Sequence, residues 1–330
     1  MASHGSAEAR ALLEKLRAYL ERRYEIRIVG LNRLERGVYR LDRKEGRSWV
    51  ARVFPVERAV ERVQGDAEVL RFLEEHDFPA ERCARPDPVS APGGRGVLVT
   101  EHIAGAKAEP NQTTLRTFAT MLGRLSSLPA GSGEVAREAG SLHHYSPREG
   151  GPRNELDAAV SWLDEVEDRV PARGRAVLES LREQVARADD CHRLPEALIH
   201  PDPVLKNLIA TPDAGHVLID WTGAGRGPRL ASLAVLIWAS ALDKEGWSPE
   251  RVDAVVAGYG SHVHLRQDEL TRLADVMRNR RLVFACWRYR HTVISGKTPD
   301  GSEWWLSSDE LVEAIAARAR TTFQRSLEKT

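Results

Sequence analysis

The sequence predicts an α+β protein of two lobes, with a small antiparallel β-sheet carrying one inserted helix in the first lobe and mainly helices in the larger second lobe. β-type runs crowd the first hundred residues, whereas helical periodicity dominates after residue 105. The length of 330 residues suits about two domains of roughly 150 residues each. We therefore expect an N-terminal β-rich lobe at 1–103 and a helical C-terminal lobe at 104–330.

The first lobe begins with a helix, because Leu13, Leu16 and Leu20 fall on one helical face with charged residues opposite. Three β-type runs follow, and the Lys-Glu-Gly sequence at 44–46 is typical of a hairpin between the last two. An amphipathic helix comes next and ends before a group of prolines. The predicted elements are a helix at 8–20, strands at 25–31, 37–42 and 48–54, a helix at 60–75 and a strand at 96–103.

The second lobe is predicted to be helical with one β-rich island. A loop that contains Gly, Ser, His and Pro separates the first two helices, at 131–153. The island consists of β-type runs at 198–209 and 216–221, joined by a Thr-Pro-Asp-Ala-Gly turn. The predicted helices lie at 114–128, 156–166, 175–188, 230–242, 249–259, 268–292 and 309–326.

Charge and cysteine content exclude several classes of protein. Lys plus Arg equal Asp plus Glu at 48 each, so the chain lacks the basic excess of a dedicated nucleic-acid binder. Three widely spaced cysteines exclude a disulfide framework and predict buried free thiols. The first ten residues show no signal pattern, and the longest apolar run, 230–242, is too short to span a bilayer. We expect a cytoplasmic protein with no nucleic-acid or membrane partner, either a monomer or a homodimer.

The strongest chemical signal is the sequence His-Pro-Asp-Pro-Val-Leu-Lys-Asn at 200–207, followed after a short hairpin by Ile-Asp-Trp at 219–221. Phosphoryl transfer needs a carboxylate that orients the acceptor hydroxyl and takes its proton. It also needs an Asn and a second carboxylate that hold Mg²⁺ against nucleotide phosphates. Asp202, Asn207 and Asp220 supply these residue types in that order. The alternative is that they cap turns and hairpins, as Asp and Asn often do.

These motifs resemble the aminoglycoside phosphotransferase and choline kinase family, whose members share the bilobal protein-kinase-like fold. The resemblance extends from about residue 25 to residue 238. It implies ATP, with GTP as an alternative, in the cleft between the lobes, Asp202 as the catalytic base, and Asn207 and Asp220 as Mg²⁺ ligands. His200 belongs to the same motif, either in the catalytic set or as the residue that holds the loop through backbone contacts.

The first lobe carries the family pattern in a modified form. The resemblance implies a basic residue on the third strand that contacts phosphates and pairs with a Glu on the next helix, and Arg52 and Glu68 stand at these places. Arg replaces the usual Lys, keeping the charge with a bulkier group; a plain surface ion pair is the alternative. Gly37 marks the phosphate-covering turn, and the backbone of Glu101 and Ile103 would hold the adenine edge.

Two further departures concern the catalytic loop. Ser232 stands where relatives have an Asp that helps to fix this loop, and Pro201 replaces the usual Gly before the catalytic Asp. Together with Arg52 they keep open a pseudokinase, a nucleotide-binding protein without turnover. The joint presence of Asp202, Asn207 and Asp220 favours an active kinase, since a protein freed from catalysis has no need of all three.

The acceptor is predicted as a small molecule, and a cationic one is one interpretation. No Lys or Arg occurs between Lys297 and Arg318, and carboxylates with neighbouring tryptophans suit an amino-bearing acceptor. The alternative is that Ser-Ser-Asp-Glu at 307–310 forms a capping box. An aminoglycoside-type antibiotic and another hydroxylated metabolite, such as an amino alcohol, a sugar or homoserine, both remain open. The residues in question are Asp300, Glu303, Trp304, Trp305, Asp309, Glu310 and Glu313.

Overall fold

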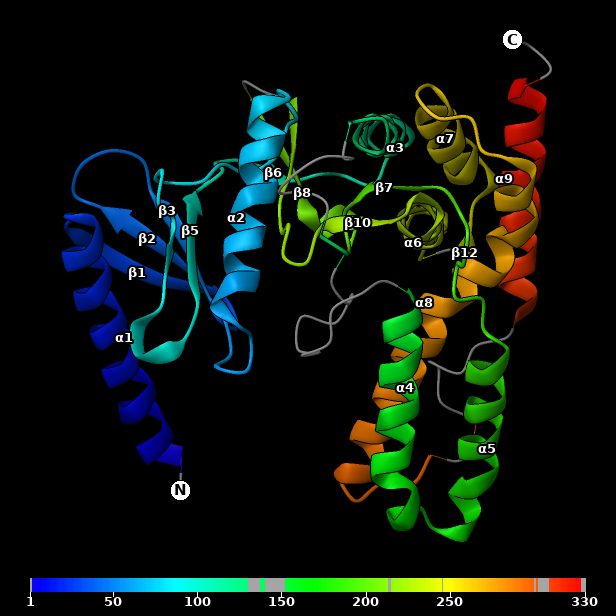
Figure 1. Ribbon diagram of the computed structural model, residues 1–330, viewed down its shortest axis with the longest axis horizontal. Helices are drawn as coiled ribbons and strands as arrows, with labels where there is room; N and C mark the ends of the chain where they lie inside the picture. Colours follow the sequence, from blue (N-terminus) through cyan, green and yellow to red (C-terminus); the bar gives the residue numbers. More distant parts are fainter. Residues whose placement is uncertain are drawn as a thin grey trace. The chain divides into compact units, whose positions relative to one another are not determined.

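The computed structural model describes residues 2–129, 137–139, 152–212, 215–244, 246–299, 301 and 309–327. The chain forms two compact units (Figure 1). The first contains Met1–Ala106 and Thr211–Ile219, and the second contains Lys107–Ala210 and Asp220–Thr330. The first stretch of this unit thus ends close to the expected boundary at 103, but the unit also includes the later segment Thr211–Ile219. The roles assigned to the two lobes stay predictions.

The first unit is built on a five-stranded antiparallel sheet with the strand order β1-β2-β3-β5-β4. One helix is inserted between β3 and β4, as predicted. A short 3₁₀ turn, η1 (Pro92–Gly94), precedes β5. The elements are α1 (Ala2–Tyr24), β1 (Ile28–Glu35), β2 (Val38–Arg43), β3 (Trp49–Val53), α2 (Val60–Glu75), β4 (Val89–Ser90) and β5 (Val97–Glu101).

Helix α1 covers one face of this sheet. Leu20 and Tyr24 of the helix join Trp49 and Ala51 of β3 in one buried apolar cluster. Because successive side chains on a strand point to opposite faces, Arg52 projects from the other face of the sheet. The alternation of residue types along β3 therefore decides where this charge lies.

The segment Thr211–Ile219 contains β9 (Gly215–Leu218) and joins the first unit through the chain that follows α2. The Leu218 amide donates to the Pro79 carbonyl at 2.9 Å, and the Glu81 amide donates to the Leu218 carbonyl at 3.2 Å. Two short strands, β6 (Ala106–Lys107) and β8 (Leu208–Thr211), lie where the chain passes from one unit to the other.

The second unit is mainly helical, and the helices start and end within a few residues of the predicted bounds. The helices are α3 (Gln112–Ser126), α4 (Pro152–Val166), α5 (Ala172–Arg187), α6 (Arg229–Ala241), α7 (Pro249–Gly260), α8 (Gln267–Ile294) and α9 (Asp309–Leu327), with a 3₁₀ turn η3 (Glu167–Arg169). Strand β7 (Glu196–Ile199) pairs with β10 (Gly225–Pro228), and β11 (Leu242–Asp243) pairs with β12 (Gly246–Trp247).

Helix α8 is the central element of the second unit. Its 28 residues correspond to about 42 Å at 1.5 Å per residue. The helix contacts α6 and α9, and also α4 and α5 (Figure 1). The contact with α4 and α5 is a buried apolar cluster that includes Leu163, Leu181, Cys286 and Tyr289. A helix packed on so many sides holds its polar side chains in fixed positions.

The expectation of one β-type run at 198–209 is wrong. Strand β7 ends at Ile199, β8 begins at Leu208, and β7 takes β10 as its partner rather than the following hairpin strand. Pro201 and Pro203 explain the interruption, because proline has no N–H to donate to a ladder.

Two predictions about the whole chain can be compared with the described residues. No helix within the described ranges is both long enough and apolar enough to cross a membrane. All three cysteines are free; Cys191 and Cys286 are buried and Cys83 is half-buried. Burial raises the pKa of the Cys286 thiol to about 12 and that of Cys83 to about 11.

Candidate active site

The loop at 200–207 is closed on itself by hydrogen bonds. The side-chain amide nitrogen Nδ2 of Asn207 donates to the main-chain carbonyl of Asp202 at 2.8 Å and lies 3.4 Å from the carboxylate oxygen Oδ2 of Asp202. The Asp202 amide donates to Nδ1 of the fully buried His200 at 3.1 Å. A 3₁₀ turn, η4 (Leu205–Asn207), ends the loop. These contacts favour the holding role for His200 among the alternatives above, and its role stays a prediction.

Asp202 is a buried carboxylate with a cation at each oxygen. Nη2 of Arg280 lies 2.9 Å from Oδ1, and Nζ of Lys206 lies 3.1 Å from Oδ2. Burial by itself would raise the pKa of Asp202, but the charges of Arg280 and Lys206 outweigh it and hold the pKa below its usual range. Asp202 is therefore ionised and fixed in direction.

Sequence reasoning missed both of these cations. Lys206 lies inside the recognised motif, where only the Asp and Asn positions were assigned a role. Arg280 lies on α8, 78 residues from Asp202 along the chain. Several arginines occur along this helix, and nothing in their spacing indicates which of them reaches the loop.

Asp220 lies two residues after β9 in a conformation that side chains rarely adopt. Its φ is +69°, in the left-handed region that Asp tolerates better than most residues, and its side chain is buried. The next residue, Trp221, is also buried, and its ring meets that of His200 edge-on with 4.7 Å between centroids. Strained backbone at a buried carboxylate is typical of functional sites.

Asn207 and Asp220 offer hard oxygen donors suited to a divalent cation. Because the Asn207 amide nitrogen is taken up by Asp202, its Oδ1 is the atom left for a metal. Within the described part of the chain, no group of three or more His, Cys, Asp or Glu residues could hold a metal ion. Mg²⁺ is commonly held by one or two protein oxygens, with its remaining ligands supplied by phosphates and water.

Ser232 holds the same loop from α6. Its hydroxyl donates to the His200 carbonyl at 2.8 Å, and both residues are buried. The departure from the family's Asp thus leaves a hydrogen bond to the catalytic loop in place. Pro201 lies within this braced segment.

Arg52 lies near a carboxylate that the sequence did not indicate. Its Nη2 lies 3.9 Å from Oε1 of Glu81, a buried residue whose Oε2 accepts a hydrogen bond from Thr100 at 3.0 Å. Thr100 lies on β5 two residues beyond Leu98, the partner of Arg52 across the strands, so all three share one face of the sheet. Glu68 is half-buried on α2, and its part in phosphate binding stays a prediction.

Gly37 forms the turn between β1 and β2. Its φ is +78°, and an added Cβ would lie 2.8 Å from the Val53 carbonyl oxygen, so glycine is required there. The Val53 amide donates to the Gly37 carbonyl at 2.7 Å, which ties the turn to the residue after Arg52.

The segment after β5 has part of its backbone already bonded. The Glu101 amide donates to the Arg82 carbonyl at 2.8 Å, and the His102 amide donates to the Ser48 carbonyl at 3.0 Å. An adenine contact by Glu101 would therefore use its carbonyl, with the amide of Ile103 as the matching donor. Both contacts stay predictions.

The acids proposed for a cationic acceptor are partly accounted for. Asp300, Glu303, Trp304 and Trp305 lie outside the described residues. Arg278 of α8 forms ion pairs with Asp309 and Glu313 at the start of α9, the first at 3.5 Å. These two carboxylates join α8 to α9, so they give a cationic acceptor no support.

Comparison with known proteins places these features in a wider group. The sequence pattern of the phosphotransferase enzyme family matches residues 25–275. A search of curated protein sequences found no match.

Several solved structures have the same protein-kinase-like fold. An amicoumacin kinase, hAmiN, solved with AMP-PNP, Ca²⁺ and Ami, aligns over 98% of this chain and 96% of its own, with 15% identity and a TM-score of 0.62. The choline kinase LicA from Streptococcus pneumoniae aligns over 96% and 99%, with 14% identity and a TM-score of 0.58. The aminoglycoside phosphotransferase APH(3'')-Id from Streptomyces rimosus aligns over 83% and 98%, with 21% identity and a TM-score of 0.56.

Proposed function

The chain belongs to the phosphotransferase enzyme family and is a small-molecule phosphotransferase, and from this premise we propose that it transfers the γ-phosphate of ATP to a hydroxyl group of its acceptor. Asp202 orients this hydroxyl and takes its proton as the new phosphorus–oxygen bond forms and ADP leaves. The state of Asp202 carries the proposal, since this carboxylate is buried, ionised and held from both sides.

The geometry suits what phosphoryl transfer asks of a protein. The transition state is loose, so positioning and charge stabilisation matter more than strong basicity. A carboxylate with a lowered pKa is a weak base, but it is always available to accept a hydrogen bond from a hydroxyl. The hydrogen bond from Asn207 to the main chain of Asp202 fixes the place at which the carboxylate would meet the acceptor hydroxyl.

Asn207 and Asp220 would hold the Mg²⁺ ion of the nucleotide. When bound, the ion neutralises phosphate charge. The residues contribute one amide oxygen and one carboxylate, and the buried position of both side chains limits competition from water.

The first unit would supply the other nucleotide contacts. Arg52 would bind phosphate oxygens while Glu81 holds its guanidinium, and the turn at Gly37 would approach the phosphates with its backbone. Backbone groups of Glu101 and Ile103 would bind the base. ATP is the proposed nucleotide, and GTP is the alternative because backbone groups can serve either purine.

The acceptor is proposed to be an aminoglycoside-type antibiotic, with another hydroxylated metabolite as the alternative. By their names, the similar structures act on amicoumacin, choline and aminoglycosides. With identities of 14–21%, they support the fold and leave the acceptor open.

Transfer from MgATP into a pooled panel of aminoglycosides, sugars and amino alcohols, read by mass spectrometry, tests the proposal. A phosphorylated product should appear with the wild type, disappear with Asp202→Asn, and persist with Asp253→Asn. Asp253 is a suitable control, because its carboxylate pairs with Arg318 between α7 and α9. ATP binding without any transfer would instead identify a pseudokinase and contradict the proposal.

A further inference from the structure

The guanidinium of Arg280 is only partly used by the contacts already described. Its Nη2 is bound to Asp202, whereas Nη1 is shielded from solvent and has no hydrogen-bond partner in the part of the chain that the structure describes. The side chain as a whole keeps 26% of its surface exposed, so a small ligand can contact the guanidinium, and a small rotation of the side chain would bring Nη1 to that ligand. A shielded N–H without a partner costs free energy that a ligand oxygen would recover.

The two oxygens of the Asp202 carboxylate face different groups. Oδ2 lies beside Lys206 and Asn207, and Oδ1 lies beside Arg280. Since Asn207 is the proposed metal ligand, the Oδ2 side corresponds to the nucleotide. The Oδ1 side is then where the acceptor hydroxyl meets the carboxylate, and Arg280 is the charged residue at that place.

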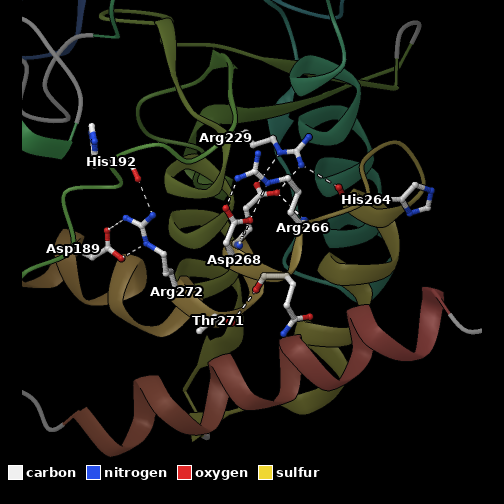
Figure 2. Close-up of polar contacts among 10 residues, drawn as sticks. Asp189, His192, Arg229, His264, Arg266, Asp268, Thr271 and Arg272 are labelled. Atoms are coloured by element: carbon white, nitrogen blue, oxygen red, sulfur yellow. Dashed lines mark hydrogen bonds and ion pairs between the residues drawn. The ribbon is translucent and has the colours of Figure 1, made fainter.

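Arg280 is presented by a firmly anchored helix. Figure 2 shows the ion pairs around the first turns of α8. Both carboxylate oxygens of the fully buried Glu269 accept from Arg229 at the start of α6, at 2.8 and 2.6 Å. Nε of Arg272 donates to Asp189 at 2.7 Å (Figure 2). These contacts hold α8 against its neighbours on two sides, so the backbone from which the Arg280 side chain extends is fixed in place.

We propose that Arg280 selects the acceptor: its Nη1 donates a hydrogen bond to an oxygen atom next to the hydroxyl that is phosphorylated. Acceptors with a hydroxyl or carboxylate at that neighbouring position are favoured over those with an ammonium group there. A guanidinium has donors and no acceptor, so it binds oxygens, whereas an ammonium group offers it only a like charge. This inference rests on the proposed function and names the acceptor class of the same site.

Matched acceptors that differ in one neighbouring group test the proposal. Suitable pairs are L-glycerate with L-serine and ethylene glycol with ethanolamine, each supplied with MgATP. The wild type should show a kcat/KM at least about tenfold higher for the oxygen member of each pair. Calorimetric titration of L-glycerate and L-serine in the presence of AMP-PNP should give the same order without turnover.

Two substitutions separate acceptor selection from the support of Asp202. Arg280→Lys keeps a positive charge beside Asp202 but lacks the second terminal nitrogen of the guanidinium, and Arg280→Gln removes the charge. Arg280→Gln should bring the ratio within each pair below about threefold, and Arg280→Lys should lower the ratio less because the like charge remains; the KM for ATP should change little in both. Arg290→Gln is the matched control on the same helix, since Arg290 pairs at the surface with Glu165; it should keep the full ratio.

The outcomes distinguish this inference from the function on which it rests. Equal use of both members by the wild type, or a preference for the amines, would overturn the inference and leave the phosphotransferase intact. An equal loss for both members in Arg280→Gln would also overturn it and assign Arg280 to the transferred phosphoryl group. Absence of transfer to every acceptor would contradict the proposed function, and the order of binding by calorimetry would then decide the role of Arg280.

Discussion

The hydrogen bond from Ser232 to the catalytic loop allows a sharp prediction about stability. Ser232→Ala removes the donor, so the buried His200 carbonyl loses the hydrogen bond of 2.8 Å that it accepts from Ser232. Removal of one partner of a buried hydrogen bond costs about 1–3 kcal/mol. We therefore expect the free energy of unfolding to fall by about 2 kcal/mol relative to a serine that lacks such a bond.

Ser240 on the same helix provides that reference. Its hydroxyl is buried and has no hydrogen-bond partner among the described residues, so Ser240→Ala loses no such bond. The gain in helix propensity from Ser to Ala is common to both variants and cancels in the comparison. Differential scanning calorimetry should show an apparent Tm lower by about 3 °C for Ser232→Ala than for Ser240→Ala.

The transfer assay gives a second measurement for the same pair. Ser232→Ala should lower kcat because the carbonyl of His200 belongs to the loop that carries Asp202, and Ser240→Ala should leave kcat unchanged. If the two variants have equal Tm values, the hydrogen bond at Ser232 contributes nothing, and the reasoning from burial and satisfaction is refuted.

Three further predictions concern packing, pH and thiol reactivity. Gly258→Ala places a Cβ 2.2 Å from the Arg116 carbonyl oxygen, where α7 meets α3, so it should lower stability by about 1–3 kcal/mol in urea unfolding; an unchanged midpoint would contradict this close approach. Burial raises the pKa of Asp189, but hydrogen bonds from Arg272 and the Cys191 amide bring it below its usual value. Its contribution to stability is therefore present above the unfolded pKa of about 4 and lost as the pH falls through the folded pKa. In Asp189→Asn the free energy of unfolding should therefore depend less steeply on pH below about 4. An unaltered slope would contradict the contribution assigned to Asp189. Since burial raises the pKa of Cys286 to about 12, this thiol should not react with a disulfide reagent at pH 8 until the protein is unfolded in guanidinium chloride.

Much of the fold could be predicted because its signals are local. The bounds of α2 match the prediction at 60–75, and those of α9 differ by one residue, since hydrophobic periodicity and caps act over neighbouring residues. The strand order of the first unit follows from short connections and one inserted helix. The β10 partner of β7 was missed, because Gly-Arg-Gly-Pro has no apolar pattern to mark a strand.

The candidate site divides in the same way. The motif at 200–207 is continuous in sequence, so its residue types and spacing could be read directly, and the internal hydrogen bonds of the loop agree with that reading. The contact between Arg52 and Glu81 could not be read in this way. The sequence suggested Glu68 on α2, which stays a prediction, whereas the contact with Glu81 depends on the path of the chain after α2, which brings Glu81 to the face of the sheet that carries Arg52.

The sequence by itself determined the helices and most strands, the loop with Asp202 and Asn207, and the glycine turn at Gly37, because each depends on residues a few positions apart. Only the tertiary structure decided which charge of α8 lies beside the carboxylate of Asp202. Arg280 reaches Asp202 across 78 residues because α8 is packed and anchored in one orientation, and the direction of a side chain on a packed helix depends on all its neighbours at once.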